Sequence, residues 1–219
     1  MTSSSIARRR AAARAEGSAR YVERRRAVLD AAQQLFQERG VERTSLDDVA
    51  AAAGTDRASL YYYVAGKKEL FYDVVRDILE VTAVSAESIQ AGPGTPKEKL
   101  HRLATMLMAS YQQRPYLQTF LSETSAGLSR EGAVGRQLLA LVEAFDQALL
   151  AIVEEGVATG AFRADLPPRV VANGFLGMIN WTHRWFDPNG ELDGAGLGDM
   201  FATIVTEGME HRRGPSTTR

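Results

Sequence analysis

The sequence predicts an all-α protein in which a small N-terminal domain is joined to a larger C-terminal domain. Apolar residues recur at spacings of three and four along almost all of the 219 residues, and no segment sustains the period-two alternation of a strand. Only seven prolines interrupt the chain. Hydrophobic side chains make up 45% of the residues, which is enough to bury a substantial core.

The first expected helix covers residues 24–39, where apolar side chains recur at helical spacing, and Gly40 ends it. Two short helices should follow. Thr44 and Ser45 each stand three residues before an aspartate, so either can open a capping box and begin a helix through residue 53.

A turn of about three residues should separate that helix from a second short helix over residues 57–64, for which Asp56 supplies the N-cap. A fourth helix starts near Lys67 and keeps one broad apolar face as far as Val81. The expected domains are a disordered basic arm at 1–20, a helix-turn-helix domain at 21–82 with its motif at about 45–64, a helical domain at 83–211 and a tail at 212–219.

The C-terminal helices follow a clear break at residues 91–94. Thr95, Pro96 and Glu98 then provide the N-cap, first-turn proline and capping-box acid of the next helix. Further helices are expected from Pro115, from Ser129 to about Gly160, from Arg169 to Phe186 and around residues 197–205.

Composition excludes several kinds of chemistry. Cysteine is absent, so disulfides, thiolate metal sites and a cysteine nucleophile are excluded, and the three histidines are scattered without metal-ligand spacing. No secretory signal or membrane-spanning run is present, which predicts a cytoplasmic protein without a membrane partner. An enzyme is one alternative, but no phosphate-binding loop, nucleophile elbow or metal pair supports it. We therefore expect no catalysis, no cofactor and no metal.

Charge is distributed unevenly along the chain. Residues 1–26 contain eight arginines and two glutamates, whereas residues 81–219 contain 12 basic and 15 acidic residues. A basic segment of this kind is either a solvated arm or a contact for a polyanion such as nucleic acid. An architectural protein that coats DNA without sequence preference should be strongly basic overall, so the net charge of −1 makes that alternative the weaker one.

The two short helices can close a small core through Leu46, Val49, Ala50, Leu60 and Val64. That core would leave the start of the second short helix exposed, as insertion into a DNA major groove requires.

A long helix, two short helices and the run Leu-Tyr-x-Tyr-Val-x-x-Lys-x-Glu-Leu at residues 60–70 resemble the DNA-binding domain of the TetR family over about residues 22–82. The sequence departs at Thr55, where the family usually has an aliphatic residue, and at Ala58, where it often has glycine or a small residue. The resemblance implies a homodimeric repressor that binds double-stranded operator DNA and is released by a small-molecule effector.

The resemblance also implies roles for the matching residues. Thr44 and Ser45 would hold phosphate through hydroxyls and backbone N–H groups. The residues that would face base edges are Arg57, Ala58, Ser59 and Tyr62. Those that would lie near phosphate are Tyr61, Tyr63 and Lys67. A tyrosine at helical spacing is more often core than contact, but three consecutive tyrosines cannot all point inward.

Beyond about residue 83 the resemblance is one of architecture, in which helices enclose a ligand cavity and two late helices dimerise. The helices at about 134–159 and 169–186 would form a four-helix bundle with the partner's copies, and Gly174 and Gly177 would permit close backbone approach. Residues 180–190 look like the ending found in family members tied to fatty-acid, acyl-CoA or steroid catabolism. The implied effector is therefore hydrophobic or acyl-CoA-like.

Large, adaptable side chains can line an apolar effector pocket, although they can equally form an ordinary core. The expected ligand contacts are Met106, Tyr111, Phe120, Phe175, Met178 and Arg184. Arg184 can meet an acidic group of the ligand or form a surface salt bridge. Trp181 and Trp185 are expected in the core or the dimer interface more than in the pocket.

Overall fold

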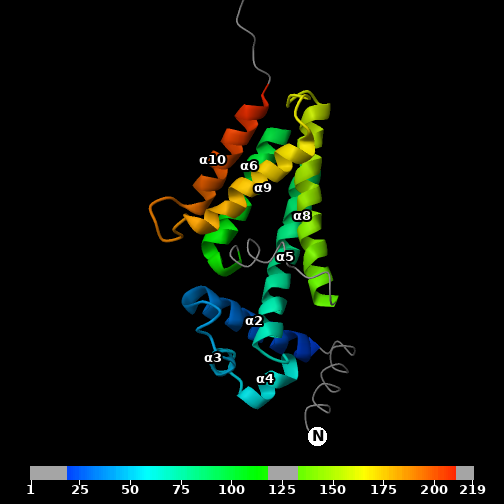
Figure 1. Cartoon of the computed structure of the whole chain (residues 1–219). Helices are drawn as coiled ribbons and strands as arrows, with labels where there is room; N and C mark the ends of the chain where they lie inside the picture. The colour runs from blue at the N-terminus through cyan, green and yellow to red at the C-terminus, as the bar shows by residue number, and fades with distance from the viewer. Residues whose placement is uncertain (1–18, 118–132, 211–219) are drawn as a thin grey trace, which may run out of the picture. The chain divides into compact units, whose positions relative to one another are not determined.

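The computed structural model describes residues 19–117 and 133–210, and within these ranges the chain consists of helices without a strand (Figure 1). The predicted all-α fold is thereby confirmed. Two compact units divide the chain between Ile78 and Leu79, inside helix α5.

The first unit contains α2 (Ala19–Arg39), α3 (Leu46–Ala52), α4 (Arg57–Tyr63) and the first part of α5 (Lys67–Ala91). Gly40 ends α2 as predicted, with a φ of +79° that favours glycine. At its other end α2 begins at Ala19, before the predicted helix start at residue 24, and Tyr21 is buried. The predicted disordered arm is therefore wrong at residues 19–20, and its residues 1–18 lie outside the described residues.

Apolar side chains from all four helices form the core of this unit. Those with no more than 2% of their surface exposed are Val28, Ala32, Phe36, Val49, Leu60, Val64, Leu70, Val74 and Val75. Leu46, which the sequence also places in this core, is only half-buried. The ion pair between Arg25 of α2 and the buried Asp73 of α5 joins the two long helices.

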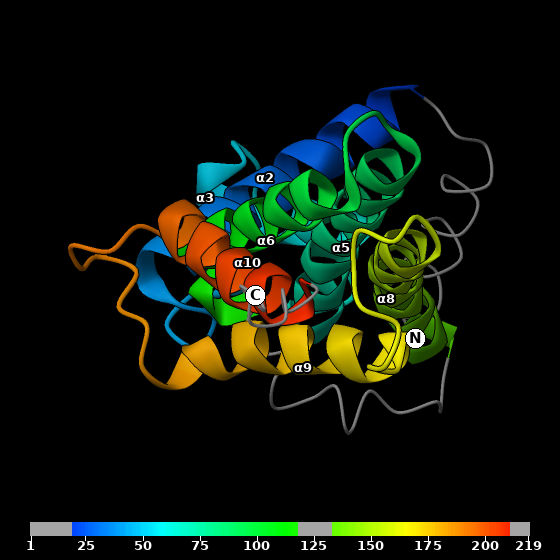
Figure 2. The same cartoon turned by 90° about the horizontal axis from the view of Figure 1, so that it is seen from above.

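The second unit contains the rest of α5, then α6 (Pro96–Gln113), α8 (Ala133–Ala158), α9 (Pro168–Trp181), the 3₁₀ helix η1 (Thr182–Arg184) and α10 (Gly194–Met209). Figure 2 shows α10 between α6 and α9, and α10 contacts both helices. Residues 115–117 are helical where the described range stops, next to the predicted start at Pro115.

Helices α6 and α10 pack unusually closely because α10 carries glycines on the facing side. A Cβ atom at Gly198 would lie 2.5 Å from the Ala104 carbonyl oxygen, and one at Gly194 would lie 2.5 Å from that of Met108. Both distances are too short for any side chain, so the glycines set the separation of the two helices.

In the second unit, one predicted helix start is confirmed and one predicted helix end is wrong. The Thr95 capping box is confirmed, since Thr95 Oγ1 accepts from the Glu98 N–H and the Glu98 carboxylate accepts from the Thr95 N–H at 2.7 Å. The predicted helix over residues 169–186 is wrong at its end, because α9 stops at Trp181 and tightens into η1. The tighter turn buries Thr182 and leaves Trp185 52% exposed, although one straight helix would put both on the same face.

Candidate nucleic-acid and ligand sites

Helix α3 begins at a capping box formed by Ser45 and Asp48. The Ser45 hydroxyl oxygen accepts from the Asp48 backbone N–H, and the Asp48 carboxylate accepts from the Ser45 N–H at 2.9 Å. These hydrogen bonds with Ser45 lower the pKa of Asp48. Thr44 lies differently, because it is buried and its hydroxyl donates to the Gly40 carbonyl at 2.9 Å. Ser45 is exposed at this helix start, whereas Thr44 holds the preceding loop.

Helix α4 presents its first turn to solvent. Asp56 caps it by accepting from the Ser59 backbone N–H at 2.8 Å and the Ser59 hydroxyl at 3.0 Å, and these bonds lower the pKa of Asp56. Arg57, Ala58 and Ser59 are exposed, whereas Leu60 is fully buried. Three of the four side chains predicted to face base edges therefore lie together on one accessible helix end.

The Arg57 guanidinium is held from two sides. Its Nη1 donates to Asp47 Oδ2 of α3 at 2.7 Å, and its Nη2 lies 3.5 Å from the Tyr61 hydroxyl oxygen. The guanidinium carbon atom, Arg57 Cζ, also lies 6.0 Å from the centroid of the Tyr61 ring. Asp47 was not expected here as a partner, because a spacing of ten residues across a turn carries no periodic signal.

The consecutive tyrosines of α4 divide between two surroundings, and all three are half-buried. The rings of Tyr62 and Tyr63 pack against Tyr21 of α2, with centroid distances of 5.6 and 5.4 Å. Tyr61 lies instead beside Arg57. Tyr62, which the resemblance assigns to base edges, thus has its ring in an aromatic cluster. No spacing in the sequence links Tyr21 to residues forty positions later.

Lys67 begins α5 and is half-buried. Its ammonium donates to the Glu42 backbone carbonyl at 3.0 Å, which connects the start of α5 to the loop before α3. An ammonium has three donors, so this hydrogen bond leaves others that can reach a phosphate.

Four of the predicted ligand contacts lie inside the second unit or at its edge. Tyr111 and Phe175 are buried, and Met106 and Met178 are half-buried. The Tyr111 hydroxyl of α6 donates to Asn180 Oδ1 of α9 at 3.4 Å, a long hydrogen bond. The fifth predicted contact, Phe120, lies outside the described residues.

A carboxyl group that the sequence did not single out lies in the same interior. Asp146 of α8 is half-buried, and this burial, together with the nearby charge of Glu143, raises its pKa to about 6, while Arg169 acts in the opposite direction. The pKa of Tyr111 is also raised, first by burial and then by the charge of Asp146. Tyr111 and Asp146 are therefore electrostatically coupled across α6 and α8.

Arg184 stands apart from these residues. It is exposed, and its guanidinium lies 5.0 Å from the ring of Trp181, which is itself 58% exposed. Helix α9 also exposes Val170, Gly174 and Gly177, and their spacing places these residues on one face of the helix. A Cβ atom at either glycine would meet nothing within 4 Å, so the chain's own packing does not require glycine there.

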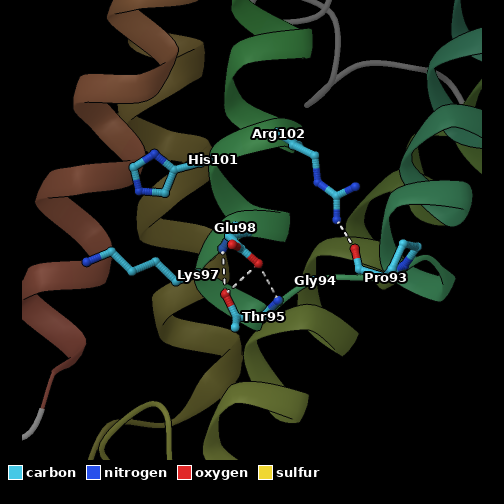
Figure 3. A pocket seen from close by; sticks show the side chains of 7 residues that line it. All are labelled: Pro93, Gly94, Thr95, Lys97, Glu98, His101 and Arg102. Carbon is cyan, nitrogen blue, oxygen red and sulfur yellow. Dashed lines mark hydrogen bonds between the residues drawn. The ribbon is translucent and has the colours of Figure 1, made fainter.

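A surface pocket of about 800 Å³ lies at the start of α6 (Figure 3). Its lining residues are Pro93, Gly94, Thr95, Lys97, Glu98, His101 and Arg102. Lys97 pairs with Glu210 at 2.9 Å, His101 with Asp199 at 2.6 Å, and Arg102 donates to the Pro93 carbonyl. These three side chains already have partners within the protein, and none of the predicted ligand contacts lines the pocket.

Within residues 19–117 and 133–210, no three acidic or histidine side chains form a group that could hold a metal ion. Among the helices of these residues, none contains an apolar stretch of the length that a membrane-spanning helix needs.

Two family models match the chain. Residues 28–74 match the bacterial regulatory proteins of the tetR family, and residues 93–209 match the tetracyclin repressor-like C-terminal domain. The HTH-type transcriptional repressor KstR2 of Mycolicibacterium smegmatis is 28% identical over 204 residues, which cover 87% of this chain and 93% of that protein.

Solved structures show the same fold. A transcriptional regulator of the TetR/AcrR family from Thermobifida fusca is 27% identical, with a TM-score of 0.71 over 86% of this chain and 100% of the other. AibR, solved with isovaleryl coenzyme A and operator DNA, is 24% identical, with a TM-score of 0.62 over 85% of this chain and 98% of its own.

Proposed function

Because the chain belongs to the tetR family of bacterial regulatory proteins, we propose that it is a homodimeric repressor released from a near-palindromic operator by a hydrophobic or acyl-CoA-like effector. Members of this family are DNA-binding transcriptional regulators and not enzymes. The architectural alternative is therefore set aside. A cytoplasmic location and the absence of any turnover are part of the proposal.

The observation that carries the proposal is the exposed first turn of α4. Leu60 and Val64 are fully buried, and this burial holds Arg57, Ala58 and Ser59 outward at one helix end. An arginine at such a position can donate two hydrogen bonds to guanine, and an alanine methyl can contact the thymine methyl. These three side chains supply the sequence preference.

Backbone contacts position the protein on the duplex. Ser45 lies exposed at the start of α3, where N–H groups and the helix dipole favour phosphate, and Lys67 adds a positive charge. The hydroxyls of Tyr61 and Tyr63 complete the phosphate contacts. Tyr62 is half-buried, and its hydroxyl is the group that would face the base edges. Thr44 acts from inside the protein by fixing the loop that places Ser45.

Dimerisation is proposed through α8 and α9. The exposed α9 face formed by Val170, Gly174, Gly177 and Trp181 is apolar and has room for a second backbone. Glycines allow helices to approach closely, and in a two-fold dimer the same face meets its own copy. A two-fold dimer then matches a near-palindromic operator.

The effector is proposed to lie among Met106, Tyr111, Phe175 and Met178, with Phe120 as a further contact. The Tyr111 hydroxyl can donate to a carbonyl oxygen, as an acyl thioester has, because its present bond to Asn180 is long. AibR supports the ligand class through its complex with isovaleryl coenzyme A. Arg184 would meet the ligand only if it left the Trp181 ring, so we place it at the outer rim.

The test begins with an operator selected from genomic fragments that the protein retains. Binding to this operator and to a random duplex is measured at one salt concentration, and a preference of about a thousandfold or more is expected. Candidate acyl-CoAs are then titrated calorimetrically with and without operator, and operator should weaken the effector by about 1 to 3 kcal/mol. Equal affinity for both duplexes contradicts the regulator, and equal effector affinity in both states contradicts that effector.

A further inference from the structure

The side chain of Arg57, which is proposed to face the bases, contacts residues of both helices of the motif. Asp47, in the first turn of α3, accepts from Arg57 Nη1 at 2.7 Å. The hydroxyl oxygen of Tyr61, one turn further along α4, lies 3.5 Å from Arg57 Nη2. The guanidinium thereby contacts one side chain of α3 and one of α4, through its two terminal nitrogen atoms.

Folding stability does not account for this arrangement. The Arg57 and Asp47 side chains are 58% and 59% exposed, and solvent screens an ion pair of that kind until it adds little to stability. Asp47 takes no part in the α3 capping box, which Ser45 and Asp48 form by themselves.

We infer that Asp47 is a positioning residue that orients Arg57 toward guanine and so determines part of the operator specificity. The inference rests on the proposed binding of operator DNA. A long arginine side chain loses rotamer freedom when it docks on a base, and a side chain that is already fixed loses less. Two hydrogen bonds to guanine O6 and N7 also require one particular plane of the guanidinium.

Because Asp47 is negatively charged, its effect on the orientation of Arg57 can be distinguished from its general electrostatic effect on DNA binding. A carboxylate beside DNA is repelled by the phosphates of every duplex, whatever its sequence. Its action through Arg57 favours only duplexes that carry guanine at the contacted position. The two effects have opposite signs, so removing the carboxylate should raise general affinity while it lowers discrimination.

The experiment compares the wild-type dimer with Asp47→Asn on the selected operator and on a random duplex, by fluorescence anisotropy at one salt concentration. We expect the affinity for random duplex to rise and the preference for operator to fall by about fivefold to tenfold. Glu42→Gln is the matched control, because it removes an exposed carboxylate of the same unit while the backbone carbonyl that accepts from Lys67 remains. Its preference should equal that of the wild type.

A double-mutant cycle assigns the effect to Arg57. In an Arg57→Ala background, Asp47→Asn should leave the operator preference unchanged, because the side chain that Asp47 orients is gone. Thermal melting by circular dichroism confirms that each variant is folded. An effect of Asp47→Asn that persists without Arg57 overturns the positioning role.

An unchanged or increased preference in folded Asp47→Asn also overturns the inference, and an increase would show that Asp47 withholds Arg57 from DNA. The proposed function is judged separately, by the wild-type protein. If the wild type discriminates and Asp47→Asn discriminates equally, only the positioning role fails. If the wild type shows no preference, the proposed function fails and the inference fails with it.

Discussion

At the scale of single residues, Asp146 is a carboxyl group placed where its charge is poorly solvated. Its pKa in the folded protein is raised to about 6 from an ordinary value of 3.8, mainly by burial. Between these two pH values the folded state binds a proton that the unfolded state has released. The contribution of Asp146 to stability is therefore complete below about pH 4 and is lost as the pH rises through about 6.

We predict that Asp146→Asn stabilises the protein at pH 7.5 by about 1 kcal/mol. A shift of this size corresponds to about 3 kcal/mol at most, and partial exposure of the side chain reduces it. Urea denaturation at fixed protein concentration should show the gain at pH 7.5 and little difference below about pH 4. Glu154 is an exposed acid on the same helix, and Glu154→Gln should leave the stability unchanged at both pH values. A variant less stable than wild type at pH 7.5 would contradict the predicted cost of this charge.

At the scale of helices, the α6–α10 contact depends on the absence of a side chain at Gly198. An added Cβ atom would lie 2.5 Å from the Ala104 carbonyl oxygen and 2.8 Å from the Thr105 nitrogen, and both are backbone atoms that cannot rotate away. The helices would have to separate, which would loosen the contacts of the buried Leu197 and Ala202.

We therefore expect Gly198→Ala to destabilise the protein by about 1 to 3 kcal/mol, the usual cost of overpacking. Gly208→Ala on the same helix is the control, because a Cβ atom there meets nothing within 4 Å. Alanine is the better helix former, so this control should be neutral or stabilising by at most about 1 kcal/mol. Chemical denaturation measures both, and equal effects of the two substitutions would show that the close contact does not set the α6–α10 distance.

At the scale of the whole molecule, the exposed α9 face that contains Gly174, Gly177 and Trp181 predicts that two copies of the chain form a dimer. We expect Gly177→Arg to fold normally, because the position is open within one chain, yet to dissociate the dimer by placing a charged side chain in the interface. Sedimentation at micromolar concentration should show a monomer, and affinity for the palindromic operator should fall sharply. Ser88→Arg, on an exposed part of α5, should remain dimeric. A dimeric Gly177→Arg variant would place the interface elsewhere.

The sequence alone determined those features whose partners lie within one helical turn. The capping box at Thr95, a capping box at either Thr44 or Ser45, and the glycine stop after α2 were predictable, because each depends on residues a few positions apart. The helix-turn-helix motif was recognisable for the same reason, since its turn, caps and apolar spacing are consecutive. These local signals also give the order of exposed and buried residues in α4.

Only the tertiary structure decided which residues distant in sequence became partners. Tyr21 packs against Tyr62 and Tyr63 of α4, Asp47 pairs with Arg57, and the Thr44 hydroxyl is directed into the protein. Asp146 acquires its raised pKa in the same way, from burial that no local pattern encodes. Hydrogen bonds along a helix have a fixed spacing and can be predicted from it, whereas side-chain contacts and desolvation depend on how separate helices pack, which leaves no period in the sequence.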